Sequence, residues 1–185
     1  MPISNKIKSV LVLSSYAVLN IGYSFGLKNI PIVDVSIIAV GFILRFFLGV
    51  IIIGSVATIW FYLIILAASY YLSFGKRRNE ILAAGETPRA VLKSYTHDFL
   101  DRNMYVCQTL IIIFYTFWAI DPVTIERLGT KSMIWTVPVV LLILFKYSLD
   151  IEKSEDGDPT SVLFKDKAIL LLCALYLAML IVIVS

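Results

Sequence analysis

The sequence predicts an all-α fold, a polytopic membrane helix bundle with about six transmembrane helices. Hydrophobic residues make up 59% of the 185 residues and charged residues only 16%, whereas a soluble domain carries roughly 25% charged residues. The apolar residues form runs of about twenty, long enough to cross a hydrocarbon core of about 30 Å. These runs do not alternate as transmembrane barrel strands do, so helices remain the structure that satisfies every backbone group in lipid.

Each apolar run predicts one spanning helix. The predicted helices are Val10–Leu27, Ile32–Gly54, Ala57–Phe74, Met104–Ile120, Met133–Tyr147 and Ala168–Val184. A tight Gly54-Ser55 turn joins the second helix to the third. Pro138 falls inside the short fifth helix, where we expect a kink or a tilt. The pattern predicts a single transmembrane domain over residues 1–185.

The lysines and arginines are distributed unequally between the two sides that six crossings define. One side holds eleven of the 16 cations: Lys28, Lys76, Arg77, Arg78, Arg89, Lys93, Arg102, Lys146, Lys153, Lys165 and Lys167. The other side holds Lys6, Lys8, Arg127 and Lys131, and Arg45 lies within the membrane. The positive-inside rule therefore places the long connections, at about 75–103 and 148–167, in the cytoplasm.

The first of these connections is expected to be structured. Thr87-Pro88 has the composition of a helix start, with Thr as the N-cap and Pro at the first helical position. Leu92, Tyr95 and Phe99 then fall on one apolar stripe, which predicts an amphipathic helix on the membrane surface. The second connection, together with Lys165-Asp166-Lys167, is interpreted as solvated loop, and Asp121-Pro122 on the other side as a turn.

The stretch SFGKRRNEIL, residues 73–82, ends the third apolar run with Lys76, Arg77, Arg78 and Glu80. Cations at this position commonly anchor a helix, because they favour the negative leaflet and the helix C-terminal dipole. A carboxylate adds nothing to anchoring. Glu80 instead suggests that an arginine is held in place or that a cation is bound, so anchoring and anion binding both remain open.

Further polar residues surround the same rim. Tyr23 and Lys28 precede the second helix, and Asp34 lies in its first turn, where its charge complements the helix dipole. Arg45 lies about three turns deeper, at a cost on the order of 2.5–3.5 kcal/mol. It requires either a structural partner or a functional pocket. His97 is the only histidine, so a histidine-based metal site is not expected.

The order YSFGLK, VDV, FILRFFLG, GKRRNEI, SYTHDFLDR and GDPTSVLFKDK resembles the C-terminal part of the UbiA-type polyprenyl transferase superfamily. Within it, the closest resemblance is to the decaprenyl-phosphate phosphoribosyltransferase-like branch. The resemblance covers nearly the whole chain. Members have nine membrane helices, and the six predicted here would match helices four to nine, the first of which starts outside, as the charge distribution independently requires.

The resemblance implies a cavity that opens to the cytoplasm in a bacterial-type inner (plasma) membrane, where Mg²⁺ and a diphosphate donor bind. It implies phosphoribosyl diphosphate and a polyprenyl phosphate lipid as partners, and nucleic acid is not expected. The positions that match substrate-binding residues are Tyr23, Lys28, Arg45, Lys76, Arg77 and Arg78. Asp34 and Glu80 are the candidate catalytic residues, which would orient those cations or assist a metal.

One family feature is missing from this sequence. Members carry an NDxxDxxxD motif between helices two and three, and no such carboxylate cluster occurs here. The main Mg²⁺ ligands would then lie in a missing N-terminal part, for which a separate N-terminal half is a candidate partner. The isolated chain is expected to be a weak or inactive catalyst. The alternatives are a non-catalytic remnant or subunit of a split enzyme and, less favoured, a membrane transporter component.

Overall fold

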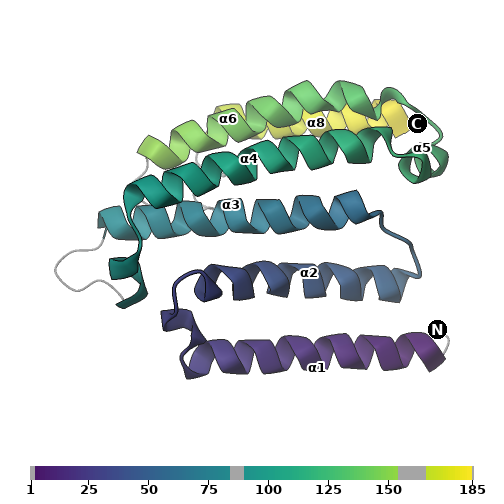
Figure 1. The fold of residues 1–185 in the computed structure, drawn as a ribbon. Helices are drawn as coiled ribbons and strands as arrows, with labels where there is room; N and C mark the ends of the chain where they lie inside the picture. The colour runs from purple at the N-terminus through teal and green to yellow at the C-terminus, as the bar shows by residue number, and fades with distance from the viewer. Residues whose placement is uncertain (1–2, 84–89, 154–165, 185) are drawn as a thin grey trace.

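The computed structural model describes residues 3–83, 90–153 and 166–184, and these residues form helices joined by short turns, with no strand among them (Figure 1). The predicted all-α fold is therefore confirmed. The long helices are α1 (Ile3–Phe25), α2 (Val33–Ile53), α3 (Ile59–Ala83), α4 (His97–Ile120), α6 (Val137–Lys153) and α8 (Lys167–Val184). The short ones are α5 (Pro122–Leu128) and the 3₁₀ turns η1 (Leu27–Asn29), η2 (Ala90–Ser94) and η3 (Ser132–Thr136).

The long helices run antiparallel in chain order, each packed against its neighbours in sequence, and α3 and α4 form the most extensive contact. Both ends of the chain lie at the same end of the bundle (Figure 1). The opposite end gathers η1, the start of α2, the end of α3 and the start of α4; we call it the basic end. The core lies between α3, α4 and α6, where Tyr71, Leu100 and Ile151 are buried.

Within the described residues, five helical segments are long and apolar enough to cross a membrane: Val33–Ile53, Ile59–Leu82, His97–Ile120, Ser132–Glu152 and Lys167–Val184. They correspond to the second to sixth predicted spans. The first predicted span lies on α1, which has 23 residues and is not among these five segments.

The helix ends at the basic end differ from the prediction. α3 continues nine residues beyond Phe74 to Ala83, so SFGKRRNEIL is helical. α4 begins at His97 instead of Met104, with Thr96 as an N-cap whose hydroxyl accepts a hydrogen bond from the Phe99 amide. The predicted amphipathic helix is wrong for residues 90–99, because η2 ends at Ser94 and α4 starts separately; its proposed start at Thr87-Pro88 lies outside the described residues.

Two proline motifs also form helix starts. Pro138 lies in the first turn of α6, where the missing amide hydrogen is tolerated, so this proline does not require the kink or tilt that the sequence predicted. Asp121 caps α5 by accepting hydrogen bonds from the Val123 and Thr124 amides, with Pro122 at the first position. The interpretation of Asp121-Pro122 as a simple turn was therefore wrong.

Candidate functional site

A buried ion-pair cluster lies at the basic end, where the first turn of α2 meets the last turns of α3. Asp34 is fully buried, and its Oδ2 accepts a hydrogen bond from Arg77 Nε at 2.8 Å. Arg77 is 3% exposed and also donates from Nη1 to Glu80 Oε2 at 2.5 Å. Glu80 follows Arg77 by three residues on the same helix face. Since a buried charge is costly without a partner, Arg77 compensates Asp34 directly.

Tyr95 completes this cluster from the segment between η2 and α4. Its hydroxyl donates to Asp34 Oδ1 at 2.6 Å and accepts from the Ile32 amide at 2.7 Å. Ile32 has a φ of 69°, a left-handed conformation that is unfavourable for a β-branched residue and costs about 1–3 kcal/mol. Tyr95 therefore fixes both the carboxylate of Asp34 and the strained backbone just before it.

Tyr95→Phe tests this role. We expect a loss of about 1–3 kcal/mol in the free energy of unfolding, because the Ile32 amide and Asp34 Oδ1 each lose their partner. Burial and the hydrogen bond to Asp34 raise the pKa of Tyr95 to about 12. The raised pKa means that this contribution is complete below the unfolded pKa of about 10 and is lost as the pH rises through about 12.

The free energy of unfolding of Tyr95→Phe and of the unsubstituted protein should be measured in detergent micelles between pH 8 and pH 12. The difference in the free energy of unfolding between the unsubstituted protein and Tyr95→Phe should become smaller toward pH 12. A gap that stays constant over this range would show that the phenol does not act through its proton.

Arg78 forms a second ion pair on the neighbouring face of α3. Its Nε donates to Asp101 Oδ1 of α4 at 2.6 Å, and its side chain is 14% exposed. Arg78 Nη1 is buried and has no hydrogen-bond partner among the residues that the structure describes. Because a buried guanidinium donor without an acceptor is costly, this nitrogen is available to an anionic ligand.

The remaining predicted cations and Tyr23 lie elsewhere. Lys28, in η1, and Lys76, in α3, are exposed. Tyr23 and Arg45 line the same small hollow between α1 and α2, with a volume of about 130 Å³. Arg45 donates from Nε to the Tyr16 hydroxyl at 3.1 Å, and its guanidinium lies 5.0 Å from the Tyr16 ring centre. The structure therefore supplies the structural partner that one of the two interpretations of Arg45 required.

Six of the eight predicted site residues thus fall into three groups, and Lys28 and Lys76 are exposed outside them. Asp34, Arg77 and Glu80 form one cluster, Tyr23 and Arg45 share a separate hollow, and Arg78 pairs with Asp101. Sequence reasoning missed Tyr95 and Asp101 as members of the site, although both lie in SYTHDFLDR, a segment that the resemblance had singled out. The sequence signal that could have found them was the presence of a tyrosine, Tyr95, and a carboxylate, Asp101, close to the start of α4.

A third charged group lies at the same end. Lys146 of α6 donates hydrogen bonds to Asp150 and to Asp166. Asp166 also accepts from the Ala168 and Ile169 amides and so caps α8. The hydrogen bond from Lys146 lowers the pKa of Asp166. Asp166 is therefore a helix cap in an ion-pair network, and its interpretation as a solvated loop charge was wrong.

The carboxylates described here do not fit a Mg²⁺ ion by themselves. Magnesium requires near-octahedral oxygen ligands, but both oxygens of Asp34 already accept hydrogen bonds from Arg77 and Tyr95. Over residues 3–83, 90–153 and 166–184, no group of three or more His, Cys, Asp or Glu side chains is placed to hold a metal.

The fold and this cluster define an integral membrane protein of the all-α polytopic class, with a buried ion-pair network at one end of the bundle. No family model matches the chain. Three curated relatives share the name decaprenyl-phosphate phosphoribosyltransferase. The one from Corynebacterium glutamicum is 30% identical over 165 residues, which are 85% of this chain and 48% of that protein.

The other two relatives give the same picture. The protein from Mycolicibacterium smegmatis is 26% identical over 171 residues, 88% of this chain and 54% of its own length. The protein from Mycobacterium tuberculosis (strain H37Rv) is 26% identical over 173 residues, 91% of this chain and 56% of its own. The predicted resemblance is confirmed, and the chain spans about half the length of the curated relatives it matches.

Proposed function

We propose that this chain is the phosphate-binding portion of a membrane-embedded transferase that moves 5-phosphoribose from phosphoribosyl diphosphate to a polyprenyl phosphate. The observation that carries the proposal is the match of 85–91% of the chain to relatives that all bear the name of this activity. The buried cluster adds support, because it fixes the one helix end in which three consecutive cations occur.

The chemistry needs positive charge at a fixed place. The lipid phosphate oxygen would form a bond to C1 of the ribose while the bond from C1 to the diphosphate breaks, and the electron pair leaves with the diphosphate. Cations that are already oriented stabilise the charge that accumulates on this leaving group. Arg78 Nη1, which has no partner, and the exposed Lys28 and Lys76 are our proposed phosphate ligands.

The other predicted residues have proposed roles that follow from their contacts. Asp34 and Glu80 hold Arg77 and so act as positioning residues for the end of α3. Tyr23 and Arg45 would contact the lipid side of the substrate from their hollow between α1 and α2. Mg²⁺ enters the proposal only with further ligands, from the substrate phosphates and from a protein segment that supplies the absent acidic motif.

The proposed setting is a bacterial plasma membrane with the basic end toward the cytoplasm. The excess of lysine and arginine at that end supports this orientation. The transfer reaction itself is tested by expressing the chain with and without an N-terminal half from a relative, and by assaying labelled phosphoribosyl transfer to polyprenyl phosphate. Absence of product in both samples, while a full-length relative is active in parallel, would contradict the proposal.

Lys28→Gln and Lys76→Gln test the phosphate ligands. Each is expected to raise the KM for phosphoribosyl diphosphate by about tenfold, the effect of losing one charge-assisted hydrogen bond. The melting temperature should not change, because both side chains are exposed. Arg102→Gln is the matched control, since its side chain is 81% exposed at the same end. If the KM values of Lys28→Gln and Lys76→Gln are no higher than that of Arg102→Gln, the two lysines do not bind the phosphates.

A non-catalytic remnant or a subunit of a split enzyme is the second candidate. Reading the DNA just upstream for a short frame that encodes NDxxDxxxD would separate a split enzyme from a remnant. Transport in proteoliposomes without any transfer product would instead favour a transporter component.

A further inference from the structure

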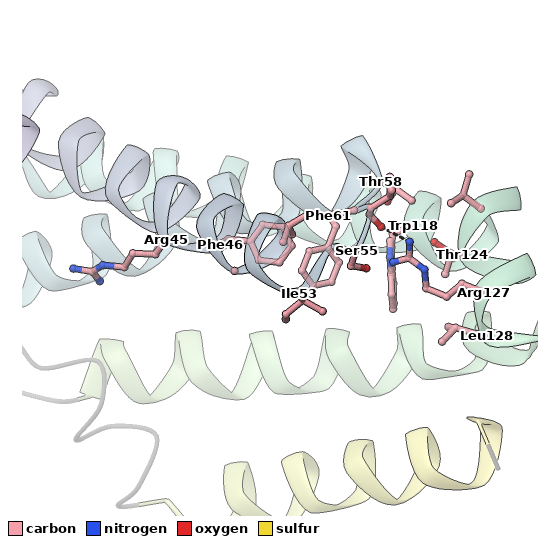
Figure 2. Close-up of a pocket in the computed structure, with 15 residues that line it drawn as sticks. Arg45, Phe46, Ile53, Ser55, Thr58, Phe61, Trp118, Thr124, Arg127 and Leu128 are labelled. Carbon is pink, nitrogen blue, oxygen red and sulfur yellow. Dashed lines mark hydrogen bonds between the residues drawn. The ribbon is translucent and has the colours of Figure 1, made fainter. Parts of the chain in front are cut away.

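A second cavity lies at the end of the bundle opposite the basic end, away from every residue assigned above to phosphate binding. It has a volume of about 510 Å³ and is enclosed by the end of α2, the start of α3, the end of α4 and α5 (Figure 2). This volume is in the range of small-molecule sites, roughly 300–1,000 Å³. Arg45 borders it only with its backbone end, because its side chain points away from the other labelled residues in Figure 2.

The body of this cavity is apolar and aromatic. Phe46 of α2, Phe61 of α3 and Trp118 of α4 form its walls, and the three rings contact one another through Phe61. Its mouth is open at the surface, since Ile53 is 80% exposed and Val56 is 67% exposed. A hydrocarbon chain from the surrounding bilayer can therefore enter it from the side.

One edge of the same cavity is polar and positively charged. Arg127 of α5 is exposed, and its Nη2 donates to the Val56 carbonyl, which holds the guanidinium over the edge. The hydroxyl oxygens of Thr58 and Thr124 are both buried and have no hydrogen-bond partner in the described part of the chain. Thr124 is only 4% exposed. Two orphaned hydroxyls beside a cation are unfavourable unless a ligand with acceptor oxygens is bound between them.

The depth of this edge matches that of a lipid headgroup. α4 ends at Ile120, and Arg127 lies in the short helix that follows, at the boundary between the apolar span and the polar interface. Simple interfacial anchoring would explain an arginine at this depth. It would not explain why the guanidinium is bound to Val56 or why two hydroxyls beside an aromatic cavity lack partners.

We propose that this cavity binds one anionic phospholipid of the adjacent leaflet, with the phosphate at Arg127, Thr58 and Thr124 and an acyl chain against Phe46, Phe61 and Trp118. The net negative headgroup complements Arg127, and phosphate oxygens accept hydrogen bonds from both threonines. This binding is independent of the transfer reaction proposed above and involves a different end of the bundle.

Fluorescence of Trp118 tests the proposal. The chain with Trp60→Phe and Trp135→Phe retains one tryptophan in the cavity wall and is placed in phosphatidylcholine vesicles. Phosphatidylglycerol with brominated acyl chains should quench Trp118 at about tenfold lower mole fraction than brominated phosphatidylcholine, since the anionic headgroup gains a charge-assisted contact. Inorganic phosphate should not relieve the quenching.

Three variants localise the effect. Arg127→Gln should abolish the preference for the anionic lipid, and Lys131→Gln, an exposed cation at the same end outside the cavity, should preserve it. Gly49→Leu should reduce quenching by both lipids, because an added Cβ meets open space there and the side chain fills the cavity. The double variant Thr58→Val with Thr124→Val keeps the shape of the cavity and removes both hydroxyls. If Arg127→Gln does not fold, this double variant replaces it, and the preference for the anionic lipid should again be lost.

The outcomes separate the possible occupants. Equal quenching by the two brominated lipids would overturn an anionic ligand, and relief by inorganic phosphate would identify free phosphate instead of a lipid. An effect of Lys131→Gln as large as that of Arg127→Gln would reduce the result to general surface charge. Unchanged quenching in Gly49→Leu would place the acyl chain outside the cavity.

Discussion

Replacement of Arg77 by methionine is expected to lower the free energy of unfolding by about 3–5 kcal/mol, the range measured when one partner of a buried ion pair is removed. The reason is the state of Asp34, which is fully buried and would keep only the Tyr95 hydroxyl as a partner. Methionine retains most of the apolar stem, so the loss reports the missing charge more than missing volume. SDS-induced unfolding in mixed micelles, followed by circular dichroism, measures it.

Lys76→Met is the matched control for Arg77→Met. It is the adjacent residue on the same helix and carries the same charge, but it is exposed, so its replacement should change stability by no more than about 0.5 kcal/mol. Equal effects of the two substitutions would contradict a special role for the buried pair.

The double variant Asp34→Asn with Arg77→Met distinguishes two contributions to the free energy of unfolding. One is the stabilisation by the ion pair, and the other is the destabilisation caused by a buried charge without its partner. Removal of both charges leaves no buried ion, so the double variant is expected to be more stable than Arg77→Met alone. If it is less stable by the sum of the single effects, Asp34 and Arg77 stabilise the fold independently.

The order of the helices could be predicted from the sequence because apolar runs and lipid thickness determine it. The ends of α3 and α4 could not. The apolar run ends near Phe74, at the boundary of the lipid. The backbone hydrogen bonds of the helix continue through KRRNEIL, whose residues are good or neutral helix formers. Thr96 was not singled out as an N-cap, and the apolar stripe of Leu92, Tyr95 and Phe99 predicted one helix where the structure has η2 and a separate start of α4.

The candidate site was predictable in composition but not in connectivity. Asp34 and Arg77 are 43 residues apart, and their contact depends on how α2 and α3 are aligned along their length. The charge pattern at this rim left anchoring and anion binding open, and only the family resemblance assigned all three cations to substrate binding. The structure instead shows that Arg77 is held by two carboxylates, while Arg78 keeps a buried nitrogen without a partner.

For Arg45 too, the sequence did not identify the residue that contacts it. Its cost in the membrane required either a structural partner or a functional pocket, and the partner found, Tyr16, lies 29 residues earlier and is one of ten tyrosines in the chain. Only the packing of α1 against α2 selects it. Residue type and depth therefore predict that a partner or a pocket exists, and the helix register decides which residue makes the contact.

Gly75→Leu is expected to destabilise the bundle by about 3 kcal/mol, the upper end of the cost of overpacking a well-packed interior. Gly75 lies in α3 where α4 and α6 converge, and an added Cβ would stand 2.8 Å from Ile151 Cδ1 and 3.4 Å from Met104 Cε. Ile151 is buried in the core and has little room to move. In lipid, helices associate mainly through such close packing, because the hydrocarbon around them is as apolar as their side chains.

Gly49→Leu is the matched control, since it makes the same exchange in α2 where an added Cβ meets open space. Both glycines lie inside helices, so the leucine improves helix propensity equally in the two variants, and any difference between them reports packing. Unfolding should be measured in detergent without added lipid, so that occupancy of the cavity beside Gly49 does not contribute. A Gly75→Leu protein as stable as Gly49→Leu would mean that α6 can move away from α3 at no cost. The buried cluster at the basic end would then depend on α2, α3 and Tyr95, without support from α6.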